Sequence, residues 1–115
     1  MASTPTFGRY AEIPYDEMTP AQQDAYRSLI ETRGRLPGPN KIYVHNPKLA
    51  KVMGPLGAYF RTGYSLSERE REIAVCVTNA MWHAAYPTSS HERWAKAAGL
   101  GDEKVDAILS DLPTS

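Results

Sequence analysis

The chain has 115 residues, of which 42% are hydrophobic and 23% charged, and its 13 Lys and Arg side chains balance its 13 Asp and Glu side chains. This length gives room for one ordinary domain, and the neutral charge lacks the basic surplus expected of a nucleic-acid binder. The single cysteine, Cys76, excludes an internal disulfide, a Cys-x-x-Cys redox pair and a cysteine-cluster metal site.

The hydropathy pattern indicates a protein outside the membrane. The longest fully apolar run, residues 73–77, is far shorter than the roughly 20 residues that a helix needs to span a bilayer. Residues 1–10 are polar and contain no apolar secretory core. We therefore expect a cytoplasmic protein with neither a membrane nor a nucleic acid as partner.

Residues 1–18 are predicted to form an irregular N-terminal arm, since prolines and a glycine interrupt them and no period is sustained. A first helix is predicted after Thr19, with proline at its first position and Gln22 placed to complete a capping box. The helix should end at Gly34, and residues 35–40 should form a loop. Three apolar side chains of the arm are candidate anchors on the rest of the chain: Tyr10, Ile13 and Tyr15.

A second helix is predicted from Asn46 to Gly63, and Pro55 inside it predicts a kink or a break. A third helix should follow and end near Trp82. Two overlapping capping boxes mark its start. They pair Ser65 with Glu68 and Ser67 with Glu70.

Residues 86–90 are predicted to break the helical pattern, and Ser89 with Glu92 then forms a further capping box for a fourth helix. A short fifth helix should start at Asp102. No alternating strand pattern is present. We therefore predict an all-α fold of about five helices, with residues 19–115 as a single helical domain.

Glu72 is the first candidate for chemistry. At helical spacing it shares a half-apolar face of the third helix with Val75, Cys76, Asn79 and His83. A carboxylate on such a face loses part of its hydration, and this suits it to general acid–base catalysis. The plainer interpretation, one more surface charge in a Glu-Arg-Glu-Arg-Glu run, stays open.

His91 is the second candidate, because a first-turn position in the fourth helix would oppose its protonation and leave a neutral, basic imidazole. A capping or packing histidine is the alternative. The three histidines lack metal-ligand spacing, and no glycine-rich phosphate loop is present, so neither a metal nor a cofactor is expected.

Four ordered pieces of sequence resemble the carboxymuconolactone decarboxylase superfamily, which includes the alkylhydroperoxidase D-like proteins. The resemblance covers roughly residues 35–110. Its pieces are the helix start HNPKLA at 45–50, the segment LSEREREIA at 66–74, the spacing of Trp82, Tyr86 and His91, and HERWAKAAGL at 91–100.

The resemblance implies the non-redox branch of this superfamily. The peroxidase pattern Glu-x11-Cys-x2-Cys-x3-His, laid from Glu72, reaches His91 but meets Ala84 and Pro87 where the two cysteines should stand. Dithiol peroxidase chemistry needs both thiols and is therefore excluded. Relatives also often carry a glutamate where this chain has Pro87, and they continue with further C-terminal helices beyond the point where this chain ends.

By this resemblance we expect an alkylhydroperoxidase D-like helical bundle that forms a trimer or hexamer. The expected enzyme is a decarboxylase-like lyase that moves protons on a small carboxylated lactone or β-keto acid. His91 would be the general acid or base and Glu72 its orienting partner or a second acid or base. An isomerase or cyclase on the same pocket and a non-catalytic helical oligomer are the alternatives. The substrate would be bound by Tyr86, His83, Arg69 as a carboxylate clamp, and Trp82.

Overall fold

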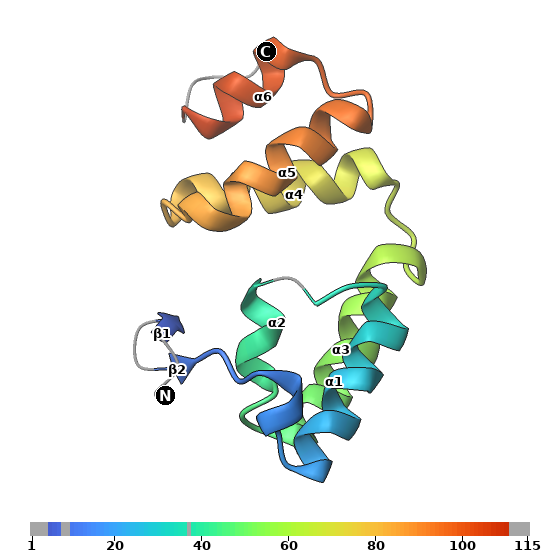
Figure 1. Ribbon diagram of the computed structural model, residues 1–115. Helices are drawn as coiled ribbons and strands as arrows, with labels where there is room; N and C mark the ends of the chain where they lie inside the picture. The colour runs from blue at the N-terminus through green and yellow to red at the C-terminus, as the bar shows by residue number, and fades with distance from the viewer. Residues whose placement is uncertain (1–4, 8–9, 37, 111–115) are drawn as a thin grey trace. The chain divides into compact units, whose positions relative to one another are not determined.

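The computed structural model describes residues 5–7, 10–36 and 38–110, and the chain divides into two compact units. Unit 1 is Met1–Tyr64 and unit 2 is Ser65–Ser115. Six α-helices are assigned in the described part of the chain, so the all-α prediction is confirmed (Figure 1). That residues 19–115 form a single domain stays a prediction.

The N-terminal arm is more regular than predicted. Strands β1 (Pro5–Phe7) and β2 (Tyr10–Ala11) pair antiparallel, and a short 3-10 helix, η1 (Tyr15–Glu17), follows. Two strands this short show no alternating pattern of side chains, so no strand could be predicted here.

The helices of unit 1 are α1 (Pro20–Arg33), α2 (Gly38–Tyr43) and α3 (Pro47–Thr62). Helix α1 begins and ends as predicted: Thr19 and Gln22 form the capping box, and Gly34 ends it with a φ of 72°, a conformation that glycine adopts without strain. Helix α3 packs against both α1 and α2. The core buries Ala25, Leu29, Val44 and Ala50.

The structure corrects two predictions for unit 1. Residues 35–40 do not form one loop, because α2 begins at Gly38; Pro39 is tolerated there since the first turn of a helix needs no N–H from it. Of the kink or break predicted at Pro55, the break is wrong, because α3 runs as one helix through this residue; the kink stays a prediction. Gly54, the residue before it, is buried against α1, and a Cβ there would lie 2.6 Å from Thr32 Oγ1. This close approach of the two helices supports α3 at the position where proline weakens it.

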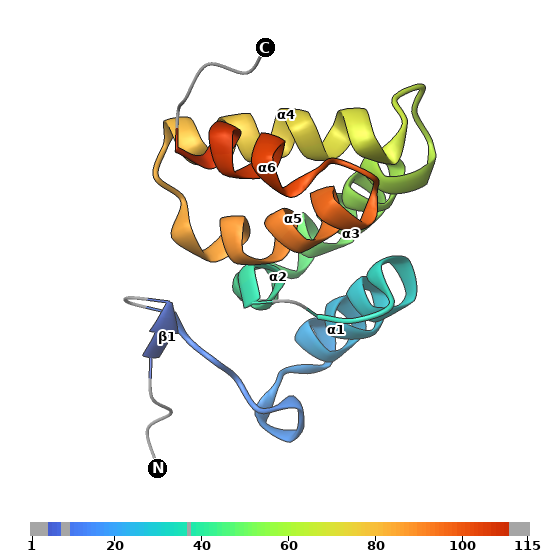
Figure 2. The same cartoon turned by 90° about the horizontal axis from the view of Figure 1, so that it is seen from above.

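The helices of unit 2 are α4 (Glu68–Met81), α5 (Ala85–Ala97) and α6 (Asp102–Leu109). Helix α4 packs against α5, and α6 packs against both (Figure 2). The core of the unit buries Cys76, Ala95, Leu100 and Val105. Of the two predicted capping boxes at the start of α4, the structure forms the one between Ser67 and Glu70.

The predicted break at residues 86–90 is wrong, because α5 begins at Ala85 and continues through Pro87. Pro87 lies in the first turn, where the backbone N–H groups have no partner within the helix. Ser89 is therefore inside the helix and does not cap it; its hydroxyl donates to the Tyr86 carbonyl oxygen at 2.8 Å.

None of the helices in the described ranges is long and apolar enough to cross a membrane.

The choice between the two capping boxes is testable. Ser67→Ala removes the hydroxyl that accepts from the Glu70 backbone N–H at 3.2 Å, and it should lower the free energy of unfolding by about 1 kcal/mol. The matched control is Ser65→Ala, which should change it by no more than about 0.5 kcal/mol because this surface residue caps no helix.

Urea unfolding followed by tryptophan fluorescence suits this test, because both tryptophans, Trp82 and Trp94, lie in unit 2. Equal losses in the two variants, or a larger loss from Ser65→Ala, would contradict the assignment of the cap to Ser67.

Candidate functional site

Glu72 lies on the buried face of α4. Together with Cys76 and Asn79, at spacings of four and seven residues, it points away from solvent, and only 1% of its surface is exposed. The helix periodicity that puts these three side chains on one face thus carries a carboxylate into the interior of unit 2. The interpretation of Glu72 as a solvated surface charge is wrong.

Both carboxylate oxygens of Glu72 have partners. His91 Nδ1, from α5, lies 2.6 Å from Oε2, and Arg71 Nε donates to Oε1 at 3.0 Å. We call these three residues the Glu72 cluster. Its members differ in exposure: the side chains of His91 and Arg71 are 23% and 20% exposed. The carboxylate is thus closed in, while the imidazole and the guanidinium reach toward water.

The contact fixes how the imidazole can act. An ionised carboxylate can only accept hydrogen bonds, so a neutral His91 that bonds it carries its proton on Nδ1. Nε2 then keeps a lone pair and points away from Glu72. In the protonated ring, Nε2 carries a proton that it can give up.

Trp94 forms a second wall for His91. The two rings meet edge to face, with their centroids 4.7 Å apart and their planes at 82°. His91 and Trp94 are three residues apart on α5, so they share a face of that helix. Carboxylate and indole together hold the imidazole in one orientation.

The remaining predicted site residues lie on the surface. Arg69, Trp82, His83 and Tyr86 are all exposed, and the structure shows no hydrogen bond from any of these described residues to Glu72 or His91. His83 adopts a φ of 51°, a left-handed conformation, so its backbone makes the turn between α4 and α5. The structure therefore brings the predicted pair, Glu72 and His91, into contact, and it shows no hydrogen bond that joins these four described residues to the pair.

The position of His91 corrects one step of the sequence argument. Because α5 begins at Ala85, His91 lies in its second turn and not in the first. The charge at a helix N-terminus falls off within the first turn, so the end of α5 does not act on this ring. The contacts described for the ring are with Glu72 and Trp94.

Arg71 and Trp94 are the site residues that the sequence analysis missed. Arg71 belongs to the run of alternating charges at the start of α4. The sequence does not show which arginine of that run contacts Glu72, because the contact depends on how α5 packs on α4. Trp94 had one usable signal, its spacing of three residues from His91 on the same helix.

Cys76 lies one turn after Glu72 and is fully buried. Burial raises the pKa of its thiol, and the carboxylates of Glu72 and Glu92 raise it further. The thiolate is thus disfavoured, and with it the nucleophile that thiol redox chemistry requires. Among the described residues no group of three or more His, Cys, Asp or Glu side chains is arranged to hold a metal ion.

Comparison of the chain with family models, with curated proteins and with solved structures gave no match. The resemblance to the carboxymuconolactone decarboxylase superfamily therefore stays a prediction.

The side-chain contacts of His91 and His45 predict opposite tautomers. His91 meets a carboxylate through Nδ1, whereas His45 meets the Ala11 carbonyl oxygen through Nε2 at 2.8 Å. Since both partners are acceptors, the neutral rings should carry the proton on Nδ1 in His91 and on Nε2 in His45. Long-range ¹H–¹⁵N correlation spectra of the ring nitrogens measure this directly.

In that experiment His45 is the internal control. A neutral His91 ring with its proton on Nε2 would contradict the Glu72 contact, and Glu72→Leu should abolish the preference in His91 while leaving His45 unchanged.

Proposed function

We propose that the protein is an acid–base enzyme of the carboxymuconolactone decarboxylase type without redox cysteines. The observation that carries the proposal is the contact between the buried Glu72 carboxylate and His91 Nδ1 at 2.6 Å. A carboxylate that orients an imidazole while the other ring nitrogen stays available is an arrangement suited to general acid–base catalysis.

The proposed substrate is a small carboxylated lactone or a β-keto acid. When such a compound loses carbon dioxide, the electron pair of the broken carbon–carbon bond passes into the neighbouring carbonyl group and forms an enolate. His91 Nε2–H then protonates the carbon that carried the carboxylate, and water restores the proton on the imidazole. Glu72 stabilises the imidazolium form and holds the ring in place. The step needs no cofactor.

Arg69 and Tyr86 enter the proposal as substrate contacts, together with His83 and Trp82. Arg69 would bind the substrate carboxylate, since a guanidinium pairs with it through two hydrogen bonds. These roles rest on the resemblance, and an Arg69→Gln variant tests the carboxylate contact separately from the Glu72 cluster.

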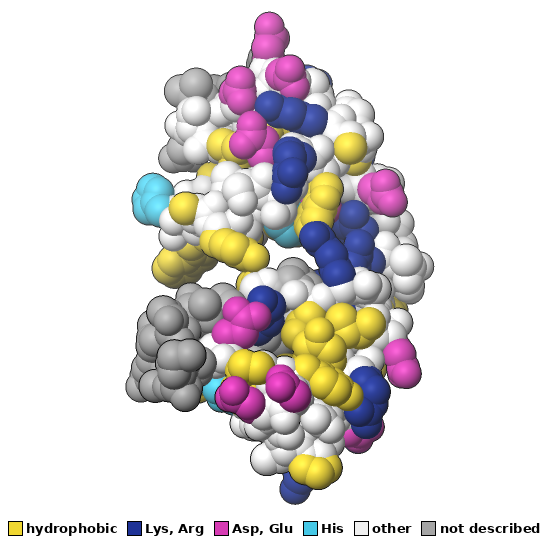
Figure 3. Space-filling model, in the orientation of Figure 1, with side chains coloured by type: hydrophobic (Ala, Val, Ile, Leu, Met, Phe, Trp, Pro, Cys, Tyr) yellow, Lys and Arg dark blue, Asp and Glu magenta, His cyan; other side chains and the backbone are white. Residues whose placement is uncertain are grey.

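We also propose that the chain acts as a homo-oligomer, a trimer or hexamer, in the cytoplasm. Large apolar side chains are exposed on both units, as Figure 3 shows on one face, and surfaces of this kind are covered when protein subunits associate. The most exposed are Val52, Tyr59 and Phe60 on α3, Met81 on α4, and Trp82 and Tyr86 next to α4 and on α5.

The test is a turnover screen with 4-carboxymuconolactone and a panel of β-keto aromatic acids, in which release of carbon dioxide is measured. His91→Gln should lower kcat about 100- to 10,000-fold, the usual contribution of a general acid or base. Glu72→Gln should also lower kcat, because the ring loses its charged partner. Arg69→Gln should raise KM more than it lowers kcat.

His45→Gln is the matched control, because it changes a histidine of unit 1 whose ring contacts Tyr10 and Ala11 of the N-terminal arm. Release that is equal in wild type and His91→Gln would contradict the assignment. Interconversion of substrate isomers without release would favour the isomerase alternative, and a folded oligomer without turnover on any compound would favour the non-catalytic one.

A further inference from the structure

Arg33, the last residue of α1, is a partly buried cation of unit 1. Its Nε is buried and donates to no acceptor, and no hydrogen bond or ion pair joins its guanidinium to any residue in the described ranges. Buried donors in folded proteins are nearly always paired, and a cation that loses water without gaining a partner is costly. The unpaired guanidinium therefore needs an explanation.

The guanidinium lies directly on the backbone of α3, the helix that packs alongside α1 (Figure 1). A Cβ at Gly57 would lie 2.9 Å from Arg33 Cζ and closer still to Nη1, and the three atoms nearest to that Cβ all belong to Arg33. Gly57 stands in the interior of α3, where glycine costs about 1 kcal/mol relative to alanine. The missing side chain leaves the space that the guanidinium occupies.

The charges that act on Arg33 are positive. Burial is the main cause that lowers its pKa, and the positive charges of Arg61 and Arg35 lower it further, while Tyr43 raises it; no carboxylate is among these groups. Arg61 and Arg35 each have another interaction, so Arg33 is the cation that is open to a ligand. A positive potential at an unpaired guanidinium attracts anions.

The end of α1 explains only part of this arrangement. A cation in the last turn suits the negative end of a helix, where the last carbonyl groups have no partner within the helix. That attraction accounts for a cation at this position. It requires neither a buried Nε without an acceptor nor a glycine beneath the guanidinium. Both features are expected where packing holds a side chain in place for a ligand.

We propose that Arg33, held on Gly57, binds a small oxyanion of the phosphate class. Nε is the nitrogen of Arg33 that is buried, so the Nη groups can donate to two phosphate oxygens, a pairing that suits the planar guanidinium. The second charge of a phosphate dianion would also be attracted by Arg61. The site is independent of the proposed acid–base chemistry, since neither Arg33 nor Gly57 belongs to the Glu72 cluster.

The test is a titration of the ¹⁵N-labelled full chain with inorganic phosphate and, separately, with phenyl phosphate, at constant ionic strength. In ¹H–¹⁵N correlation spectra, the Nε–H signal of Arg33 and the amide signals of residues 33–36 and 57–61 should shift and saturate in the millimolar range. Tighter binding of phenyl phosphate would assign the site to phosphate esters, and tighter binding of inorganic phosphate would assign it to the free ion.

Two variants separate a built site from a general attraction by charge. Arg33→Gln should weaken phosphate binding about tenfold or more, because it removes charge-assisted hydrogen bonds. Gly57→Ala changes no charge and favours the helix, yet it displaces the guanidinium and should also weaken binding several-fold. In the Arg33→Gln background, Gly57→Ala should have no further effect, since the side chain that it displaces is gone.

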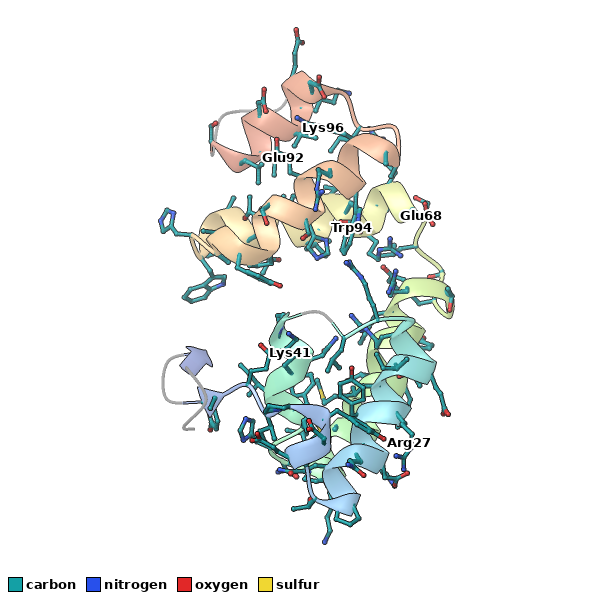
Figure 4. The ribbon with its side chains drawn as sticks, in the orientation of Figure 1. Arg27, Lys41, Glu68, Glu92, Trp94 and Lys96 are labelled. Carbon is teal, nitrogen blue, oxygen red and sulfur yellow. The ribbon has the colours of Figure 1, made fainter. Side chains whose placement is uncertain are left out.

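Arg27→Gln is the matched control, because it removes the same charge from an exposed position of α1 (labelled in Figure 4) and should leave binding unchanged. The proposal is overturned if the shifts do not saturate or fall outside these residues, or if chloride produces them as well. It is also overturned if Gly57→Ala binds phosphate as wild type does, or if Arg27→Gln weakens binding as much as Arg33→Gln. None of these results depends on turnover at His91.

Discussion

The buried carboxylate of Glu72 is the constraint on which unit 2 depends. A charge removed from water costs several kcal/mol unless partners neutralise it, and Glu72 is almost fully buried. Arg71 supplies one partner from the same helix, but His91 comes from α5. Two interactions therefore hold α4 against α5. One is the apolar packing of Cys76 and Ala95 in the core, and the other is the contact of the Glu72 carboxylate with His91.

The same constraint creates the candidate site. An ordinary helix pair would place apolar side chains at these positions, which would pack as well and cost less. With Glu72 in place, the imidazole is oriented through Nδ1, braced by Trp94, and left with Nε2 for chemistry. The stability of the helix pair and the geometry of the site thus rest on one set of side chains, so substitutions at Glu72 act on both.

The sequence predicted those features of the fold that depend on residues close together in the chain. The caps formed by Thr19 with Gln22 and by Ser67 with Glu70 were predictable, because a capping box depends only on neighbours three residues apart. The starts of α2 and α5 were not predictable, because a proline fits the first turn of a helix as well as it fits a loop. Tertiary packing decides whether a helix or a loop forms there. Choosing between the capping boxes of Ser65 and Ser67 also required the structure.

In the candidate site, too, the sequence predicted some residues and missed those whose roles depend on helix packing. Glu72 and His91 were found from their spacing and from the family resemblance, and the structure places them in contact. Arg71 and Trp94 were missed, because their roles follow from how α5 lies on α4. Of the four surface residues expected around the pair, His83 was also suggested by its helical spacing from Glu72, and the resemblance suggested the others.

A double-mutant cycle tests most directly whether the buried Glu72 carboxylate and the partly exposed His91 imidazole act as a coupled pair. Unfolding free energies of wild type, Glu72→Gln, His91→Gln and the double variant should give a coupling of about 1–3 kcal/mol. A parallel cycle on Glu92 and Lys96, a partly exposed pair 3.0 Å apart on α5 that is labelled in Figure 4, should give about 0.3–0.5 kcal/mol. A coupling between Glu72 and His91 no larger than that of the Glu92–Lys96 pair would contradict the account.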